Sequence, residues 1–139
     1  VVMENTNARH LTAEIFHTHP PASAGPSLSL TEGEGWGEGL FDLIVCDASF
    51  ISLKKVLPAA LALAKQKATL IALIKPQFEV GKVEASKGEG VIRDPALHKT
   101  VCDDITAWIE HEGWQVKGLA PSPITGPAGN IEFLLYAIR

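Results

Sequence analysis

The stretch TLIALIKPQFE, residues 69–79, decides the fold of this 139-residue chain. Its first six residues form an apolar run, which is typical of a strand buried in a parallel sheet. Pro76 lacks an amide hydrogen and disfavours helical backbone at the residue before it, so Lys75 should stand at the end of the strand. Open α/β sheets bind ligands beyond the carboxyl ends of their strands, which makes Lys75 a candidate functional residue. The alternative is a lysine whose stem packs on apolar surface while its ammonium group reaches water.

Strands and helices alternate on both sides of this stretch. Ser52 is a suitable N-cap for one helix, and Pro58 within it predicts a late start or a kink. Asp94 and Pro95 open a second helix, which ends at Gly113. The predicted elements are strands at residues 1–4, 41–46, 68–73, 114–119 and 131–138, a helical turn at 11–16, and helices at 53–65 and from 95 to about 111.

This order of elements predicts one α/β domain over residues 1–139. Strands that alternate with helices form a parallel sheet with right-handed crossovers. The last two strands are joined only by the turn-rich loop 121–130, so they should pair antiparallel. The predicted fold is a Rossmann-like methyltransferase sheet, mostly parallel with an antiparallel last strand. Residues 17–40, rich in Pro, Ser, Gly and Glu, predict a flexible loop.

The composition indicates an ordinary globular protein in a reducing compartment, and we therefore expect the cytoplasm. Hydrophobic residues make up 46% of the chain and charged residues 20%. No apolar stretch is long enough to span a membrane, and no signal peptide is recognisable. Cys46 and Cys102 fall in a predicted strand and a predicted helix, where they are expected to be buried free thiols. His17 and His19 lack further ligands at suitable spacing, so no metal site is expected.

Three charged residues stand at strand positions that the sheet should bring to one rim. Asp47 follows the strand 41–46, Lys75 follows the strand 68–73, and Glu132 opens the last strand. Because consecutive strands are usually neighbours, Asp47 and Lys75 should project from the same edge. A carboxylate on each side of a lysine would hold its position, and the lysine could then take a proton from an attacking hydroxyl.

The sequence resembles the hemolysin-A group of FtsJ-like RNA methyltransferases. Four segments carry the resemblance: DASFIS (47–52), LIKPQFE (73–79), GVIRDP (90–95) and SPITGPAGNIEFLL (122–135). It runs from about Glu4 across the chain, except for residues 17–40. It implies a Rossmann-like fold that uses S-adenosylmethionine, and 2′-O-methylation of ribose in ribosomal RNA. Members of the family use a Lys-Asp-Lys-Glu tetrad, and Asp47, Lys75 and Glu132 match its last three members.

The resemblance also predicts that the domain is incomplete at its N-terminus. The family's first lysine and its glycine-rich cofactor loop would precede Glu4, and its S4-type RNA-binding domain would come earlier still. The start of the chain, Val1-Val2-Met3, reads as the inside of a strand. An exposed sheet edge makes a homodimer a further expectation. The alternative function is a non-catalytic RNA- or protein-interaction fragment, whereas a haemolytic role has no amphipathic or spanning segment to support it.

Further residues are candidates for binding, each beside a simpler structural role. The cofactor contacts expected from this fold are Asn5, Thr6, Asn7 and Asp47; the first three could equally form a turn. The RNA contacts expected are Lys82, Lys87 and Arg93, which could also be a solvated loop. With a net charge of −4, the chain has no overall basic character, so RNA binding would need such a local patch.

Five other polar residues are assigned mainly structural roles. Ser52 is expected to cap a helix, and Ser49 either to do so or to contact RNA. Asn130 should order its turn, with ribose contact as the second possibility. Glu79 should pair with a lysine of the following loop, and His98, on the first turn of its helix, should be exposed rather than catalytic.

Overall fold

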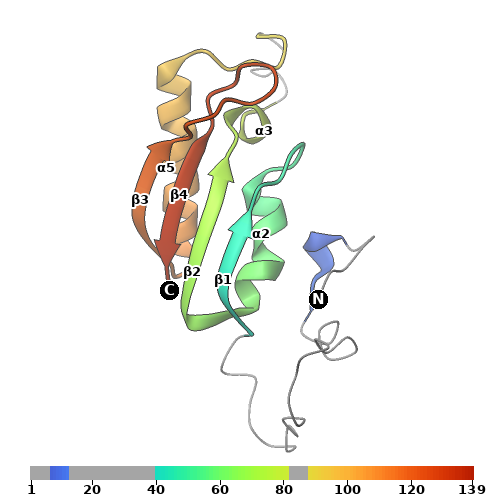
Figure 1. The fold of residues 1–139 in the computed structure, drawn as a ribbon, viewed down its shortest axis with the longest axis vertical. Helices are drawn as coiled ribbons and strands as arrows, with labels where there is room; N and C mark the ends of the chain where they lie inside the picture. Colours follow the sequence, from blue (N-terminus) through green and yellow to red (C-terminus); the bar gives the residue numbers. More distant parts are fainter. Residues whose placement is uncertain (1–6, 13–39, 82–87) are drawn as a thin grey trace, which may run out of the picture.

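A computed structural model describes residues 7–12, 40–81 and 88–139 of the chain. It contains a four-stranded sheet in the order β1-β2-β4-β3 (Figure 1). The strands are β1 (Phe41–Cys46), β2 (Ala64–Ile74), β3 (Gln115–Pro121) and β4 (Phe133–Ile138). The helices are the 3-10 helix η1 (Ala8–His10) and the α-helices α2 (Leu53–Ala62), α3 (Pro76–Glu79) and α5 (Pro95–His111).

The sheet has the predicted mixed topology. β1 pairs parallel with β2, and α2 makes the connection between them. β4 is inserted between β2 and β3 and pairs antiparallel with both, so that β3 runs in the same direction as β1 and β2. The prediction of a mostly parallel sheet with an antiparallel last strand is therefore confirmed. The insertion places the start of β4 beside the carboxyl end of β2, where Ile74 pairs with Phe133.

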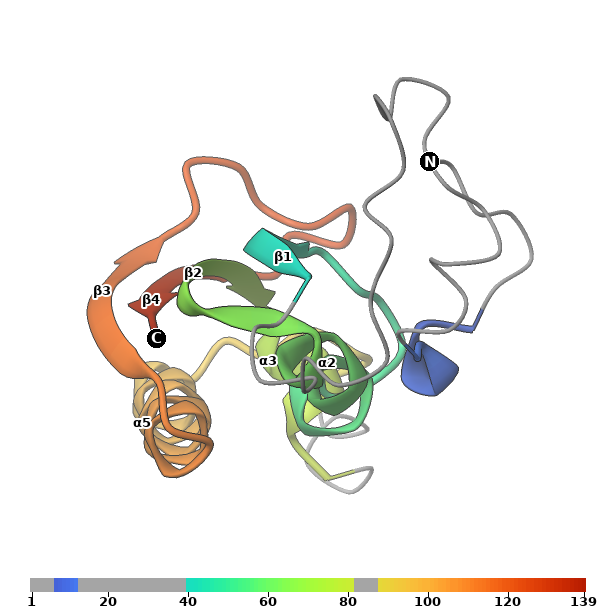
Figure 2. The same cartoon turned by 90° about the horizontal axis from the view of Figure 1, so that it is seen from below.

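The core lies between the sheet and the helices α2, α3 and α5, which lie on one face of the sheet (Figure 2). Side chains alternate along each strand, and those on the helical face, such as Leu70, Ile74 and Leu135, are fully buried. On α5, Ile105 and Ile109 are one turn apart and fully buried, as the sequence predicts. Trp108, on the same helix, is half-buried.

The other face of the sheet is apolar and exposed. The ladder places Val45, Ile71 and Tyr136 side by side on this face, and each is more than one-third exposed. Leu43 and Leu134 extend the same surface along β1 and β4. Within the described ranges, no helix combines the length and the hydrophobicity that a membrane crossing requires.

The first crossover differs from its prediction. The helix predicted for residues 53–65 begins at Leu53 as expected, contains Pro58 without a late start, and ends at Ala62. The following strand begins at Ala64 rather than at residue 68, because the backbone is already paired there: the Leu63 carbonyl accepts hydrogen bonds from the amides of residues 40 and 41, at 2.7 and 3.1 Å. Ala64 therefore lies in a strand and not in the predicted helix, and its side chain is buried there.

Three further boundaries are corrected. The short helix near the start lies at Ala8–His10, and Leu11 and Thr12, which were predicted as part of a helical turn, are not helical. The last strand begins at Phe133, so Glu132 precedes it rather than opening it. The helix α3 was not predicted, since Pro76 was taken only as the end of the ladder. The predicted strand at 1–4 and the loop at 17–40 lie outside the described residues, apart from residue 40.

The helix α5 has the predicted ends. The Asp94 carboxylate accepts a hydrogen bond from the Ala96 amide at 2.9 Å, and Pro95 occupies the first helical position. Gly113 follows the helix with a φ of +85°, the left-handed conformation that glycine adopts without strain. His98, which was predicted to be exposed, is buried instead: its Nε2 lies 2.9 Å from the Ile92 carbonyl, and its ring contacts the edge of Phe133.

Asn130 orders the loops above the sheet, as predicted. Its Oδ1 accepts a hydrogen bond from the buried Ile92 amide at 2.9 Å, and its Nδ2 donates to the Gly90 carbonyl at 3.0 Å. Its own carbonyl accepts from the Gly126 amide. One buried side chain therefore fixes the approach to α5 against the loop before β4.

We predict that Asn130→Ala lowers the free energy of unfolding by about 1–3 kcal/mol, because it leaves the buried Ile92 amide without an acceptor. Urea unfolding monitored by circular dichroism measures this change. Gln115→Ala, at an exposed strand position, is the control and should change stability by less than about 0.5 kcal/mol. Equal stability of the two variants would contradict the role given to Asn130.

Candidate functional site

The site centres on Lys75, at the carboxyl end of β2. Its Nζ lies 2.6 Å from Asp47 Oδ1 and donates a hydrogen bond to Ser49 Oγ at 3.0 Å. The Lys75 side chain is only 11% exposed, whereas Asp47 is 65% exposed. The prediction that Asp47 and Lys75 project from one rim is therefore confirmed. The arrangement presents a held ammonium group at the edge where α/β sheets bind ligands.

Pro76 determines how Lys75 is presented. Lys75 has extended backbone (φ −113°, ψ 97°) and is the N-cap of α3, which starts at Pro76. Proline suits the first helical position because its missing amide hydrogen has no intrahelical acceptor there. The chain thus leaves the sheet and turns into a helix within two residues. Lys75 remains at the rim while the next four residues turn towards other parts of the site.

The last residue of α3, Glu79, fastens the helix to the start of α2. Glu79 accepts hydrogen bonds from Ser52 Oγ at 2.6 Å and from the Leu53 amide at 2.8 Å, so it caps the start of α2. Ser52 also caps α2 itself, as predicted, by accepting from the Lys54 amide. The lysines of the loop after Glu79, with which it was expected to pair, lie outside the described residues. These contacts fix the segment that carries Asp47 and Ser49.

Glu132 is buried, with 6% exposure, but it forms no hydrogen bond or ion pair with Lys75. Its Oε1 accepts a hydrogen bond from Gln77 Nε2 at 3.1 Å. Among the residues that the structure describes, no cation lies within ion-pair distance of this carboxylate. The expectation of a carboxylate on each side of Lys75 is therefore met by Asp47 but not by Glu132. No pattern in the sequence pointed to Gln77, which connects α3 to Glu132 just before β4.

Because Gly126 has no side chain, the carboxylate of Glu132 can lie directly beside it. A Cβ at this glycine would lie 2.9 Å from Glu132 Oε1, too close for an ordinary contact. The loop before β4 therefore passes directly over the carboxylate. Gln77 contributes a second unusual feature, because its Oε1 is buried and has no hydrogen-bond partner among the described residues. A buried acceptor without a donor costs about 1–3 kcal/mol.

An exposed aromatic residue lies on the turn that carries Ser49. Phe50 has a φ of +63°, which is rare for a residue with a bulky side chain, and it is 90% exposed. Its ring lies 4.9 Å from the ring of Phe78 on α3, tilted by 45°. Phe50 follows Ser49, the hydroxyl partner of Lys75, so an exposed aromatic ring lies on the same turn as that hydroxyl.

Neither cysteine is positioned as a nucleophile. Cys46, next to Asp47, is half-buried; burial raises the pKa of its thiol, and the charges of Asp47 and Glu79 raise it further. Burial, with a contribution from Asp103, raises the pKa of Cys102 to about 11. Both thiols are therefore protonated near neutral pH. The described ranges contain no group of three His, Cys, Asp or Glu side chains that could hold a metal ion.

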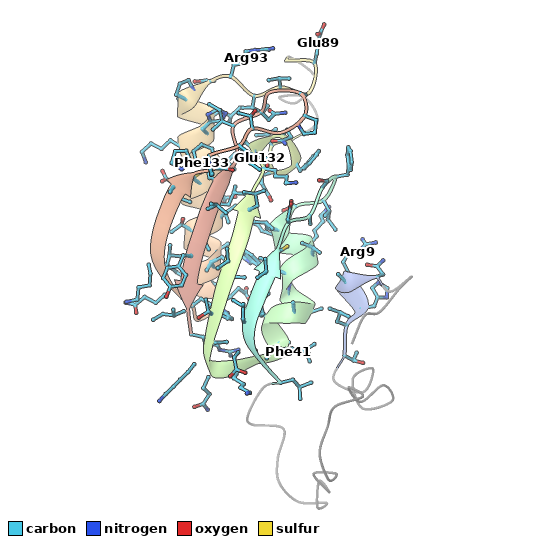
Figure 3. The ribbon with its side chains drawn as sticks, in the orientation of Figure 1. Arg9, Phe41, Glu89, Arg93, Glu132 and Phe133 are labelled. Carbon is cyan, nitrogen blue, oxygen red and sulfur yellow. The ribbon has the colours of Figure 1, made fainter. Side chains whose placement is uncertain are left out.

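The remaining predicted binding residues are only partly described. Asn7 Oδ1 accepts a hydrogen bond from the Arg9 amide at 3.1 Å and so caps η1, whereas Asn5 and Thr6 lie outside the described residues. Lys82 and Lys87 also lie outside them. Arg93 is exposed, immediately before α5. Figure 3 shows Arg93 and Glu132 at the same end of the molecule, with Phe41 at the opposite end of the sheet.

A family model described as FtsJ-like methyltransferase matches residues 1–139 of the chain. The 16S/23S rRNA (cytidine-2′-O)-methyltransferase TlyA of Mycobacterium tuberculosis is 39% identical over 136 residues, which are 98% of this chain and 42% of TlyA. Hemolysin A of Brachyspira hyodysenteriae is 31% identical, over 99% of this chain and 49% of that protein. The chain thus spans less than half the length of these relatives.

Solved structures agree with this similarity. A protein from Streptococcus thermophilus whose structure is titled as a hemolysin superposes with a TM-score of 0.78 at 34% identity. The match covers 99% of this chain and 42% of that protein. A similarly titled protein from Lactococcus lactis gives a TM-score of 0.77, also at 34% identity, and covers 56% of that protein. The sheet order and the positions of the helices are therefore those of known proteins.

We predict that Glu79→Gln lowers the free energy of unfolding by about 1.5–3 kcal/mol, since it removes the charge that strengthens two hydrogen bonds to the start of α2. Glu110→Gln, at an exposed position on α5, is the matched control. Chemical unfolding measures both variants, and hydrogen exchange at the Leu53 amide reports the local effect. If Glu79→Gln behaves like the control, Glu79 does not hold the two helices together.

Proposed function

Because this chain belongs to the FtsJ-like methyltransferase family, we propose that it forms part of an S-adenosylmethionine-dependent enzyme that methylates ribose 2′-hydroxyl groups of ribosomal RNA. The observation that carries the proposal is the buried position of Lys75 between Asp47 and Ser49. The similarity to TlyA, a protein named as an rRNA 2′-O-methyltransferase, supports the choice of substrate. It favours the enzyme over the non-catalytic fragment considered from the sequence.

The geometry suits activation of a hydroxyl group. An ammonium group has three donors, and at Lys75 these face Asp47, Ser49 and one further direction. To act as a base, Lys75 must be in its amine form, in which a lone pair takes the place of the third N–H. A ribose hydroxyl in that direction would donate to this lone pair, and its proton would pass to the amine as the hydroxyl oxygen attacks. Asp47 would then stabilise the resulting ammonium through the short ion pair. Glu132 remains a proposed catalytic residue, acting from its buried position beyond Gln77.

The described residues offer a partial fit for the cofactor. S-adenosylmethionine supplies a methyl group on a positively charged sulfur, which makes the methyl carbon an electrophile. Asp47 uses Oδ1 for Lys75, and its Oδ2 has no partner in the described part of the chain. That oxygen, on a largely exposed residue at the carboxyl end of β1, suits a hydroxyl or ammonium donor of the cofactor. Asn5, Thr6 and Asn7 are proposed to contact the adenine, although Asn7 Oδ1 already accepts from Arg9.

RNA would approach across the rim formed by the loops at this end of the sheet. Phe50 presents an exposed ring on the turn that carries Ser49, and stacking on aromatic rings is the usual way in which proteins hold an unpaired RNA base. Arg93, which has no ion pair with any described residue, is a proposed phosphate contact together with Lys82 and Lys87. We further propose that the reaction takes place in the cytoplasm, and that the protein forms a homodimer.

We predict that Lys75→Met abolishes most methyl transfer, by about 10²–10⁴-fold, since it removes the group that orients the hydroxyl and accepts its proton. The assay uses the full-length protein, radiolabelled S-adenosylmethionine and ribosomal RNA, with the modified nucleoside identified by mass spectrometry. Lys67→Met, at an exposed position on β2, is the control. Undiminished transfer by a folded Lys75→Met variant would refute the assignment.

We predict that Phe50→Ala raises the KM for RNA about tenfold or more, because stacking contributes about 1–3 kcal/mol per base. Its stability should change little, since the ring is exposed and alanine keeps the same strained backbone conformation. Ile124→Ala removes another exposed apolar side chain and is the matched control. An unchanged KM for Phe50→Ala would show that the ring does not contact the substrate.

A further inference from the structure

We propose that Gln77 is a positioning residue of the transfer reaction, which acts by holding the Glu132 carboxylate in place. This inference rests on the proposed function. Gln77 Nε2 donates to Glu132 Oε1 at 3.1 Å, and Gln77 Oε1 is buried with no donor in the part of the chain that the structure describes. The residue stands two positions after Lys75, on α3, and so joins the lysine's segment to the start of β4.

The carboxylate fixes the orientation of the amide. An ionised carboxylate can only accept hydrogen bonds, so the glutamine must present its NH2 group to it. The opposite orientation would bring two oxygens together and would leave the carboxylate without a donor. The carbonyl of Gln77 is consequently directed to a place where the described residues supply no donor. The unfavourable carbonyl position is therefore a consequence of binding Glu132.

Gln77 is the single hydrogen-bond donor to the Glu132 side chain within residues 7–12, 40–81 and 88–139. Gly126 only leaves room for the carboxylate, and Lys75 is engaged by Asp47 and Ser49. Removal of the amide would leave the buried carboxylate without the donor that the described residues supply to it. The direction in which Glu132 points thus depends on Gln77.

A purely structural role explains this arrangement poorly. An apolar pair at positions 77 and 132 would fill the space without an unpaired carbonyl and without a buried charge. Both unfavourable features lie in one short region that also contains Lys75. Strained or unsatisfied groups that cluster beside reactive residues indicate positioning for chemistry.

The decisive variant is Gln77→Met, which keeps the length of the side chain and removes the donor. In the full-length protein with S-adenosylmethionine and ribosomal RNA, we expect kcat to fall about 10²-fold, as a misplaced group does, with the KM for RNA unchanged. Gln115→Met, on the exposed part of β3, is the control. A crystal structure of the Gln77→Met protein should show the Glu132 carboxylate displaced within an unchanged fold.

A second variant, Gln77→Glu, gives a readout that a structural role would not produce. Two adjacent carboxyl groups cannot both ionise easily, so the pair holds one proton up to a raised apparent pKa. Below that pKa the protonated group at position 77 can donate to Glu132, and activity should be restored. Above it the two charges repel, and activity should be lost. Gln115→Glu should retain the wild-type pH profile.

The outcomes separate this inference from the proposed function. If the wild-type protein transfers no methyl group to RNA, the proposed function fails and this inference falls with it. If the wild-type protein is active and Gln77→Met retains its kcat, only the role of Gln77 is overturned. The same conclusion follows if Gln77→Met lowers thermal stability and kcat while Gln77→Glu shows no recovery at low pH.

Discussion

The site depends on the abrupt turn from β2 into α3 at Lys75 and Pro76. Proline ends the ladder and starts a helix of four residues, so consecutive side chains point in different directions within a very short distance. Gln77 reaches Glu132 before β4, Phe78 meets Phe50, and Glu79 caps α2. No other described segment of comparable length contacts so many separate parts of the rim. A change of backbone at Pro76 would therefore alter every one of these contacts together.

The sheet order explains why this turn can join residues so distant in the sequence. The insertion of β4 between β2 and β3 brings residue 132 to the same rim as residue 75, and Ile74 pairs directly with Phe133. Had β4 paired on the far side of β3, Glu132 would lie a strand further away. The parallel pairing of β1 and β2 likewise brings Asp47 to Lys75, within 2.6 Å. The topology thus determines which charged residues meet, and α3 determines how they are held.

Much of the fold follows from patterns that local physical chemistry produces. The strand Phe41–Cys46 and the helix Pro95–His111 have the predicted bounds, because their apolar periodicity and their caps agree. The crossover after α2 does not, since Ala64 suits either a helix or a strand and a backbone contact with residues 40 and 41 decides between them. His98 was likewise misjudged: it lies on the first helical turn, but a carbonyl 2.9 Å away and the ring of Phe133 bury it.

The charged residues of the site could be predicted from the sequence, but the hydrogen bonds that hold them could not. Position after a buried strand suffices to identify Asp47 and Lys75, because parallel strands end at one edge. Gln77 carries no such signal, because its partner Glu132 is 55 residues away in the sequence. Pro76 was read as the end of a strand, so the short helix that contains Gln77 was not expected. The one sign in the sequence was its place inside the segment LIKPQFE, part of the resemblance to the methyltransferases. Local rules predict elements in which every buried polar group is paired. The Gln77 carbonyl, which has no donor among the described residues, departs from this rule. Such departures are expected where a protein holds reactive groups in place.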